Sequence, residues 1–252
     1  MKKITVSFAE SLESENEKNM FGFSIEVLKE LFPSLYLGDK MILADRNVSF
    51  LSDNKFLEVS DQIAKADVYK GMLWRVHTLL WAVDTIKHLT GDFVECGVFR
   101  GFKSYFILKY FADVISDDYW LYDTFSGQPS EYQSTSPVSN SEHNKPLLLQ
   151  FVKERFSEFK NVKIIQGTVP SILYNNSPKA VKFLHLDLNS TDAEIGALDF
   201  FYNRIVKGGI IVLDDYGHLS FKDQMVAQKK WFKTRDCTVL ELPTGQGIVI
   251  KK

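Results

Sequence analysis

The stretch over residues 91–104 constrains the fold more than any other part of the chain. It opens with a short apolar run over residues 93–98 that contains a single acid, Glu95. Gly97 and Gly101 follow, and an apolar periodic segment continues over residues 102–112. This order predicts a buried strand, a tight glycine turn and the start of a helix. In an open α/β sheet, ligands bind at the carboxyl end of such a strand.

The same stretch indicates which class of ligand fits. A dinucleotide-binding turn typically reads Gly-x-Gly-x-x-Gly, so that a pyrophosphate can rest on the helix N-terminus. Here Phe99 and Phe102 stand in place of the second and third glycines, and Glu95 would repel a diphosphate but attract a cationic amine. S-adenosylmethionine carries an ammonium, a sulfonium and a ribose but no phosphate, so we predict it as the cofactor. The alternative is a purely structural turn.

Composition excludes several classes of partner. The 252 residues carry a formal net charge of −2, which gives no electrostatic case for binding nucleic acid or an anionic membrane. Cys96 and Cys237 both lie in apolar runs and are typical of buried thiols in a reducing compartment. The chain shows neither the apolar segment of a signal peptide near Met1 nor an apolar run of about 20 residues. We therefore expect a cytoplasmic protein.

The patterns after residue 65 alternate between strands and helices. We expect strands over 93–98, 119–122, 162–166, 181–186 and 210–213, with helices between them, and then a hairpin over 238–242 and 247–250. Parallel strands need helical crossovers, so this order predicts a doubly wound α/β sheet. A mostly parallel, seven-stranded sheet that ends in an antiparallel hairpin is the layout of the class I methyltransferase (Rossmann-like) fold.

The N-terminal quarter differs from the rest. Its apolar content is too thin for a core of its own, so we interpret residues 1–64 as an accessory helical segment and residues 65–252 as the cofactor-binding domain. We expect residues 1–22 to be loosely ordered and a helix over 23–31. Further along, a helix over 192–206 should end at Gly208 and Gly209.

A second acid, Asp123, ends the second predicted strand. An acid at this position is well placed to accept hydrogen bonds from the ribose hydroxyls, although it could instead cap an Asx turn. Phe125, just after it, is a candidate to flank the adenine. Gly167 and Thr168 follow the third strand and are candidates to contact the adenine edge.

Three more acids follow the fourth and fifth strands: Asp187, Asp214 and Asp215. Carboxylates that converge at one sheet edge raise one another's pKa unless a cation lies among them. Mg²⁺ prefers oxygen ligands of this kind, so we predict a magnesium site. The alternative is that each acid caps a helix or pairs with Lys or Arg. We expect the nearby His185 to point to the opposite side or into packing.

Transfer of a methyl group to a hydroxyl also benefits from a base. His143 is our candidate, because it lies in a long polar loop over residues 126–145, and loops of that length are usually functional or mobile. An ordinary exposed loop histidine is the alternative. Asp187 completes the predicted catalytic pair.

The segments over 91–101, 123–129, 183–189 and 213–216 together resemble the macrocin-type O-methyltransferases, which are metal-dependent enzymes that methylate sugar hydroxyls in natural-product biosynthesis. The resemblance covers about residues 65–252. It implies S-adenosylmethionine at Glu95, Gly97, Ser104 and Asp123, Mg²⁺ at the three strand-end acids, and the catalytic base in the loop that carries His143. The full predicted cofactor-binding set is Glu95, Gly97, Arg100, Gly101, Ser104, Asp123, Thr124, Phe125, Gly167, Thr168 and Asp187.

We therefore expect an S-adenosylmethionine- and Mg²⁺-dependent O-methyltransferase. Its acceptor would be a small hydroxylated molecule, a sugar or glycoside of natural-product or surface-polysaccharide biosynthesis. Two alternatives stay open: an NAD-type oxidoreductase of the same sheet class, and a non-catalytic binding protein that kept the fold. It also stays open whether the protein forms a homo-oligomer.

Overall fold

The computed structural model describes residues 12, 14–63, 70–127, 147–235 and 237–252. The chain divides into two compact units, residues 1–78 and 79–252, and the boundary falls within helix α5 (Leu73–Ile86). The boundary that we predict, between residues 64 and 65, lies outside the described residues. Among the helices that are described, none combines the length and apolar character needed to cross a membrane.

The first unit begins with a long helix, α2 (Glu15–Leu31). The Ser14 side chain accepts a hydrogen bond from the Glu17 amide, and the Glu17 carboxylate accepts one from the Ser14 amide. This capping box starts the helix eight residues before our prediction, so the expectation of loose order is wrong over residues 15–22. The unit continues with β1 (Tyr36–Gly38), β2 (Met41–Leu43), the 3₁₀ turn η1 (Ser49–Ser52) and α3 (Asn54–Ile63).

The second unit is built on a seven-stranded sheet with the strand order β5-β4-β3-β6-β7-β9-β8. The strands are β3 (Asp92–Cys96), β4 (Tyr119–Asp123), β5 (Val162–Gln166), β6 (Val181–Leu186), β7 (Ile205–Leu213), β8 (Leu240–Glu241) and β9 (Gly247–Ile250). The first five strands in that order are parallel, and the β8–β9 hairpin adds to β7 in the antiparallel sense. The predicted fold class is confirmed.

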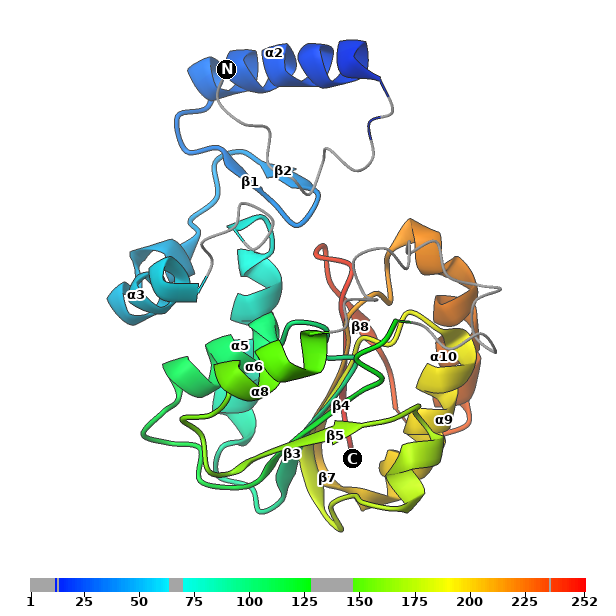
Figure 1. Cartoon of the computed structure of the whole chain (residues 1–252). Coiled ribbons are helices and arrows are strands. Elements are labelled where there is room, and N and C mark those ends of the chain that lie inside the picture. The colour runs from blue at the N-terminus through cyan, green and yellow to red at the C-terminus, as the bar shows by residue number, and fades with distance from the viewer. Residues whose placement is uncertain (1–11, 13, 64–69, 128–146, 236) are drawn as a thin grey trace. The chain divides into compact units, whose positions relative to one another are not determined.

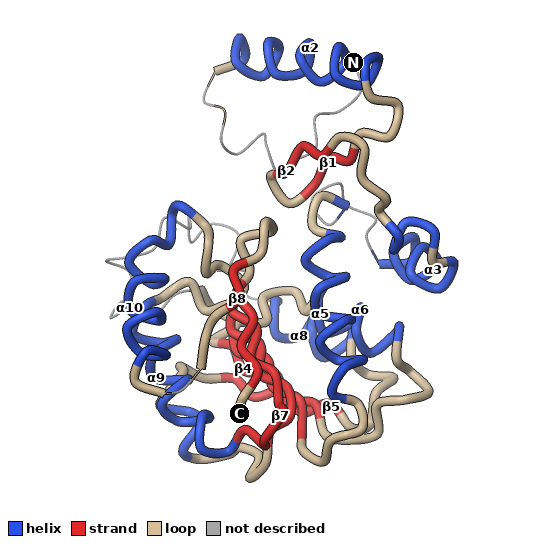
Figure 2. The backbone as a smooth tube through the Cα atoms, turned by 180° about the vertical axis from the view of Figure 1, so that it is seen from behind, coloured by secondary structure: helices blue, strands red, loops and turns tan. Residues whose placement is uncertain are grey.

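Helices cover both faces of this sheet. Figures 1 and 2 show α6 (Phe102–Tyr110) and α8 (Leu148–Arg155) on one face and α9 (Thr191–Phe201) and α10 (Lys222–Lys233) on the other. The 3₁₀ turns η3 (Ser171–Tyr174), η4 (Tyr202–Arg204) and η5 (Leu219–Phe221) join the elements. Strand β6 is buried along its whole length, as a parallel strand covered on both faces requires.

A second helix boundary also differs from the sequence expectation. Helix α9 ends at Phe201, and β7 already begins at Ile205, so the helix predicted over 192–206 is too long. Gly208 and Gly209 do not break a helix but lie inside the strand, where the Gly208 amide donates to the Lys251 carbonyl and the Gly209 carbonyl accepts from the Lys251 amide. Gly208 adopts a φ of 81°, which an L-residue tolerates poorly, and glycines in a strand often mark such irregular pairing.

The parallel register brings the predicted residues to one edge of the sheet. Cys96 pairs with Tyr122 on one side and with Leu186 on the other, and Leu186 pairs with Leu213. The residues that end or directly follow these strands are Gly97, Asp123, Asp187 and Asp214. The sheet therefore positions the glycine turn and the acids side by side along its carboxyl edge.

Helix α9 also contributes a fully buried acid, Glu194, that the sequence patterns did not single out. Its carboxylate accepts a hydrogen bond from the Leu188 amide at 3.2 Å and another from the Gln228 side chain. Burial raises the pKa of this carboxyl well above its usual range. Glu194 thus holds the loop after β6 while it resists ionisation.

We expect Glu194→Gln to make stability less sensitive to pH. A carboxyl with a higher pKa in the folded state than in the unfolded state binds its proton more tightly when folded, so stability is lost as pH rises from about 4.5. Thermal unfolding at pH 5 and pH 8 should therefore show a smaller fall in Tm for Glu194→Gln than for wild type. The exposed Glu154→Gln is the control and should follow wild type. An equal fall for Glu194→Gln would mean that Glu194 is ionised in the fold.

Candidate functional site

The turn after β3 is held by a carboxylate from the neighbouring strand. Asp123 Oδ2 accepts hydrogen bonds from the backbone amides of Val98 at 2.7 Å and Phe99 at 2.8 Å. Asp123 Oδ1 accepts one from the amide of Phe125 at 2.7 Å, which is the Asx-turn contact that we kept as an alternative. One side chain therefore fixes the loops after β3 and β4, and a role in ribose binding remains a proposal.

These contacts bear on the kind of ligand that the turn can take. In a dinucleotide-binding fold, amides at the glycine turn are available to a pyrophosphate. Here the Val98 and Phe99 amides already donate to Asp123, and a phosphate brought to them would meet a carboxylate. This arrangement disfavours a diphosphate cofactor and suits a nucleoside without phosphate.

Backbone strain gathers at the same edge. Phe99, Phe125 and Asn189 have φ angles of 50°, 52° and 55°, and each lies in the loop that follows β3, β4 or β6. Residues other than glycine rarely adopt this left-handed conformation, and such strain is concentrated at functional sites. The loops at the carboxyl edge are therefore held in unusual shapes by the surrounding fold.

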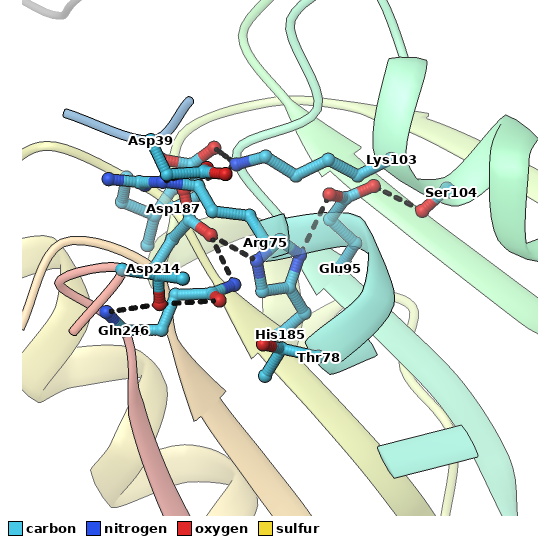
Figure 3. A network of polar contacts seen from close by, with 12 residues as sticks. Asp39, Arg75, Thr78, Glu95, Lys103, Ser104, His185, Asp187, Asp214 and Gln246 are labelled. Atoms are coloured by element: carbon cyan, nitrogen blue, oxygen red, sulfur yellow. Dashed lines mark hydrogen bonds and ion pairs between the residues drawn. The ribbon is translucent and has the colours of Figure 1, made fainter. Parts of the chain in front are cut away.

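A buried chain of polar contacts leads away from Glu95 (Figure 3). One oxygen of Glu95 accepts a hydrogen bond from the Ser104 hydroxyl, and the other lies 2.9 Å from His185 Nδ1. His185 Nε2 lies 3.3 Å from Asp214 Oδ1. The exposed fraction of each of these four residues is 2% or less. Glu95 is thus engaged by its neighbours in the fold.

His185 is buried, as one of the two expectations for it required, but the other expectation, that it points to the opposite side, is wrong. The register pairs Glu95 with His185 directly, so both side chains point to the same face of the sheet. Burial alone would lower the pKa of His185, but its hydrogen bonds to Asp214 and Glu95 outweigh burial and raise that pKa to about 9. The imidazole is held as a cation between two carboxylates.

The three predicted metal ligands come together. One carboxylate oxygen from each of Asp187, Asp214 and Asp215 lies within 4.8 Å of those of the other two. Asp214 and Asp215 are buried, and the Asp187 side chain is 23% exposed. Three carboxylates from two neighbouring strand ends are a donor set that fits a hard divalent cation such as Mg²⁺.

The same cluster also contains an ammonium. Lys103, in the first turn of α6, places Nζ 2.7 Å from Asp187 Oδ2 and 2.5 Å from Asp214 Oδ2. Gln246 Nε2 donates to Asp214 Oδ1 at 3.1 Å. The alternative that we kept for these acids, pairing with a lysine, is therefore present in the structure for two of the three.

The other predicted residues take backbone or loop roles. Gly101 caps α6 with a φ of 71°, and the Arg100 carbonyl accepts a hydrogen bond from Arg155 at 2.9 Å. Thr124 Oγ1 donates to the Gly127 carbonyl at 2.6 Å. After β5, the Gly167 amide donates to the Asp123 carbonyl, and the Thr168 carbonyl accepts from Ile172, each at 2.9 Å. His143 lies outside the described residues.

Sequence reasoning missed Lys103, His185 and Gln246. Lys103 could have been found, because a lysine in the first turn of an otherwise apolar helix opposes the helix dipole and calls for acidic partners. His185 needs the strand register, since its alternation along β6 alone does not say which neighbour it faces. Gln246 lies in the hairpin turn, and no local pattern marks it.

A cavity of about 310 Å³ is lined by residues of the loop after β6, the start of α9, the 3₁₀ turn η5 and the start of α10. Polar residues in its lining include Asn189, Thr191, Ser220, Asp223 and Gln224. Gln224 is 2% exposed, and neither its amide nitrogen nor its oxygen has a hydrogen-bond partner in the described part of the chain. Both amide atoms are covered by the surrounding protein, so they form a buried polar group that is unpaired among the described residues and are not part of the cavity surface.

Gly97 should tolerate no side chain. Its φ is 89°, and an added Cβ would collide with the backbone carbonyl of Asp187. Gly208 is a matched control, because its φ is 81° and an added Cβ would meet only a Leu89 side-chain atom at 3.5 Å. We expect Gly208→Ala to lower the free energy of unfolding by about 1–2 kcal/mol, as the left-handed conformation alone requires. Gly97→Ala should cost more, because backbone must also move. Equal losses in chemical denaturation would contradict this account.

A sequence model of the macrocin O-methyltransferase (TylF) family matches residues 59–238. A rhamnosyl-tetracenomycin-C 4'-O-methyltransferase of Streptomyces olivaceus is 27% identical over 57% of this chain and 60% of its own length. The mycinamicin III 3''-O-methyltransferase of Micromonospora griseorubida is 28% identical over 50% of this chain and 55% of its own length. The aligned region thus spans less than two thirds of each relative.

Solved structures are similar in fold. The O-methyltransferase NovP has a TM-score of 0.58 at 19% identity and covers 71% of this chain, with 80% of its own length matched. The calicheamicin methyltransferase CalS11 has a TM-score of 0.56 at 13% identity, with 81% of this chain and 94% of its own covered. The family match extends over more than two thirds of the residues, from the end of α3 to beyond α10. This chain is a member of the macrocin O-methyltransferase family.

Proposed function

We propose that this protein is an S-adenosylmethionine-dependent O-methyltransferase, that its acceptor is a hydroxyl of a sugar or glycoside, and that Mg²⁺ assists at Asp187, Asp214 and Asp215. The proposal rests on the family membership and on relatives whose names describe sugar O-methylation. The observation that carries it is the convergence of the glycine turn and four strand-end acids at one edge of the sheet.

The cofactor would bind over the loops after β3, β4 and β5. When bound, S-adenosylmethionine supplies a methyl group on a positively charged sulfur. Asp123 pre-shapes this region, because it holds the amides of Val98 and Phe99 before any ligand arrives. Asp123 Oδ1 keeps one lone pair for a ribose hydroxyl beside the Phe125 amide, and Glu95 adds negative charge that favours a cationic ligand. Because the amides that would bind a pyrophosphate already donate to Asp123, this turn favours S-adenosylmethionine over a dinucleotide.

The metal would bind at the three strand-end acids. When bound, Mg²⁺ supplies a Lewis acid that orients the acceptor hydroxyl and lowers its pKa. The chain's own residues hold the carboxylates for this purpose: His185 and Gln246 both engage Oδ1 of Asp214. The donor chemistry and spacing of the cluster support a hard cation.

The acceptor would lie in the cavity of about 310 Å³ whose lining includes Asn189, two residues beyond Asp187. The lining of this cavity includes the polar residues Asn189, Ser220 and Asp223, whose donors and acceptors suit the hydroxyls of a sugar. The reaction forms an oxygen–methyl bond, breaks the sulfur–methyl bond and releases the hydroxyl proton. We propose His143 or Asp187 as the group that takes this proton. Asp187 suits the role because, among the described contacts, its Oδ1 accepts no hydrogen bond.

Calorimetry with S-adenosylhomocysteine tests the cofactor site. We expect wild type to bind it, and Asp123→Ala to bind it at least about tenfold more weakly, because the turn loses three backbone anchors and a ribose contact. Asp113→Ala, an exposed acid in the same unit, is the control and should bind like wild type. Binding of NAD in place of S-adenosylhomocysteine would favour the oxidoreductase alternative.

Radiolabelled methyl transfer to a panel of rhamnosides and nucleotide-activated deoxysugars tests the activity. We expect turnover that requires Mg²⁺ and drops by on the order of 100-fold in Asp214→Asn, because the metal site loses one negative charge. Full activity in EDTA would show that the reaction does not need Mg²⁺, and it would leave the proposed methyltransferase activity standing. Tight cofactor binding with no turnover on any acceptor and no response to Mg²⁺ would instead favour the non-catalytic alternative.

A further inference from the structure

The lysine at the acidic cluster does more than balance charge. Lys103 Nζ lies between Asp187 and Asp214, at 2.7 Å and 2.5 Å from one oxygen of each, and its side chain is 9% exposed. The lysine comes from α6, whereas the acids come from the ends of β6 and β7. A buried ammonium shared by two carboxylates forms charge-assisted hydrogen bonds, which are stronger than neutral ones.

The oxygens of Asp214 are divided between two kinds of partner. Oδ2 accepts from Lys103, whereas Oδ1 is contacted by His185 at 3.3 Å and by Gln246 at 3.1 Å. His185 is anchored in the central strand β6, and Gln246 lies directly before the strand β9. The Lys103 ammonium stands at the end of a flexible four-carbon stem. Lys103 is therefore the partner that can leave while the carboxylate stays in place.

We infer that Lys103 is a built-in competitor for the divalent cation: its ammonium occupies the place between Asp187 and Asp214 that a metal would take, and it withdraws when a metal binds. This inference rests on the proposed metal site. Mg²⁺ binds carboxylate oxygens at about 2.0–2.1 Å. An ammonium in hydrogen-bond contact with the same two oxygens would compete for their lone pairs, and its charge would repel the ion.

Two consequences follow for the protein. Without metal, the cluster is not left as bare carboxylates, because the ammonium offsets part of their repulsion. With metal, the observed affinity is lowered by the free energy needed to move Lys103 away. The acids therefore bind a divalent cation more weakly than the same donor set would without the lysine.

Mn²⁺ binding, followed by electron paramagnetic resonance, tests the competition without any measure of activity. We expect Lys103→Met, which keeps the unbranched stem, to bind Mn²⁺ about tenfold more tightly than wild type, as a coupling of ordinary size predicts. Lys109→Met removes a more exposed lysine of the same helix that pairs with Glu158, and it should match wild type. Equal or weaker binding by Lys103→Met would overturn the inference and leave the metal site standing. Binding by neither protein would overturn both.

A second measurement uses wild-type protein and separates displacement from a general charge effect. The buried Lys103 ammonium should give a distinct ¹H–¹⁵N signal in metal-free protein, assigned in the wild-type protein by through-bond correlations along the Lys103 side chain. Saturation with Mg²⁺ should shift or abolish that signal, while the Lys109 signal stays unchanged. A Lys103 signal that is unchanged at saturation would show that the ammonium keeps its place, and would overturn the inference even if Lys103→Met fails to fold.

Discussion

The carboxyl edge of this sheet depends on the burial of opposite charges next to one another. Glu95, His185, Asp214, Lys103 and Asp187 form one continuous set of contacts across β3, β6, the end of β7 and α6. Each of these groups would be expensive to bury alone, because the low-dielectric interior penalises an unpaired charge. Together they fix the relative position of three strands and a helix at the place where ligands bind in this fold class.

This network links two predicted sites that the sequence presents as separate. Glu95 belongs to the predicted cofactor set, and Asp214 belongs to the predicted metal set. His185 joins them, since its two ring nitrogens contact one carboxylate each. A change in charge at one site is therefore felt at the other through a single imidazole, and substitutions at the two sites are not expected to be additive.

The fold could be predicted from local patterns because each strand has its own signal. Apolar runs bounded by acids or glycines marked the parallel strands, and the hairpin followed from the last two β-runs. The site was only half predictable. Acids such as Asp187 and Asp214 can be recognised in the sequence, because they are the first polar residues after buried strands. The partners of those acids cannot be recognised in this way. Lys103 reaches the acids from a helix, and the neighbour that His185 faces depends on a register that only the folded sheet defines. The start of α2 was not predicted for another reason: the segment that contains its capping box is rich in acidic residues, which is also typical of a loosely ordered chain.

The hold that Asp123 exerts on the turn after β3 has a consequence for protein engineering. The loop over 97–101 takes its shape from a side chain that stands 26 positions beyond Gly97, on a different strand. A chimera that transplanted this loop alone would carry its glycines but would lack the Asp123 carboxylate that holds the loop amides. The smallest portable piece of this architecture is therefore the whole β3–α6–β4 unit, ending with the residues that follow Asp123.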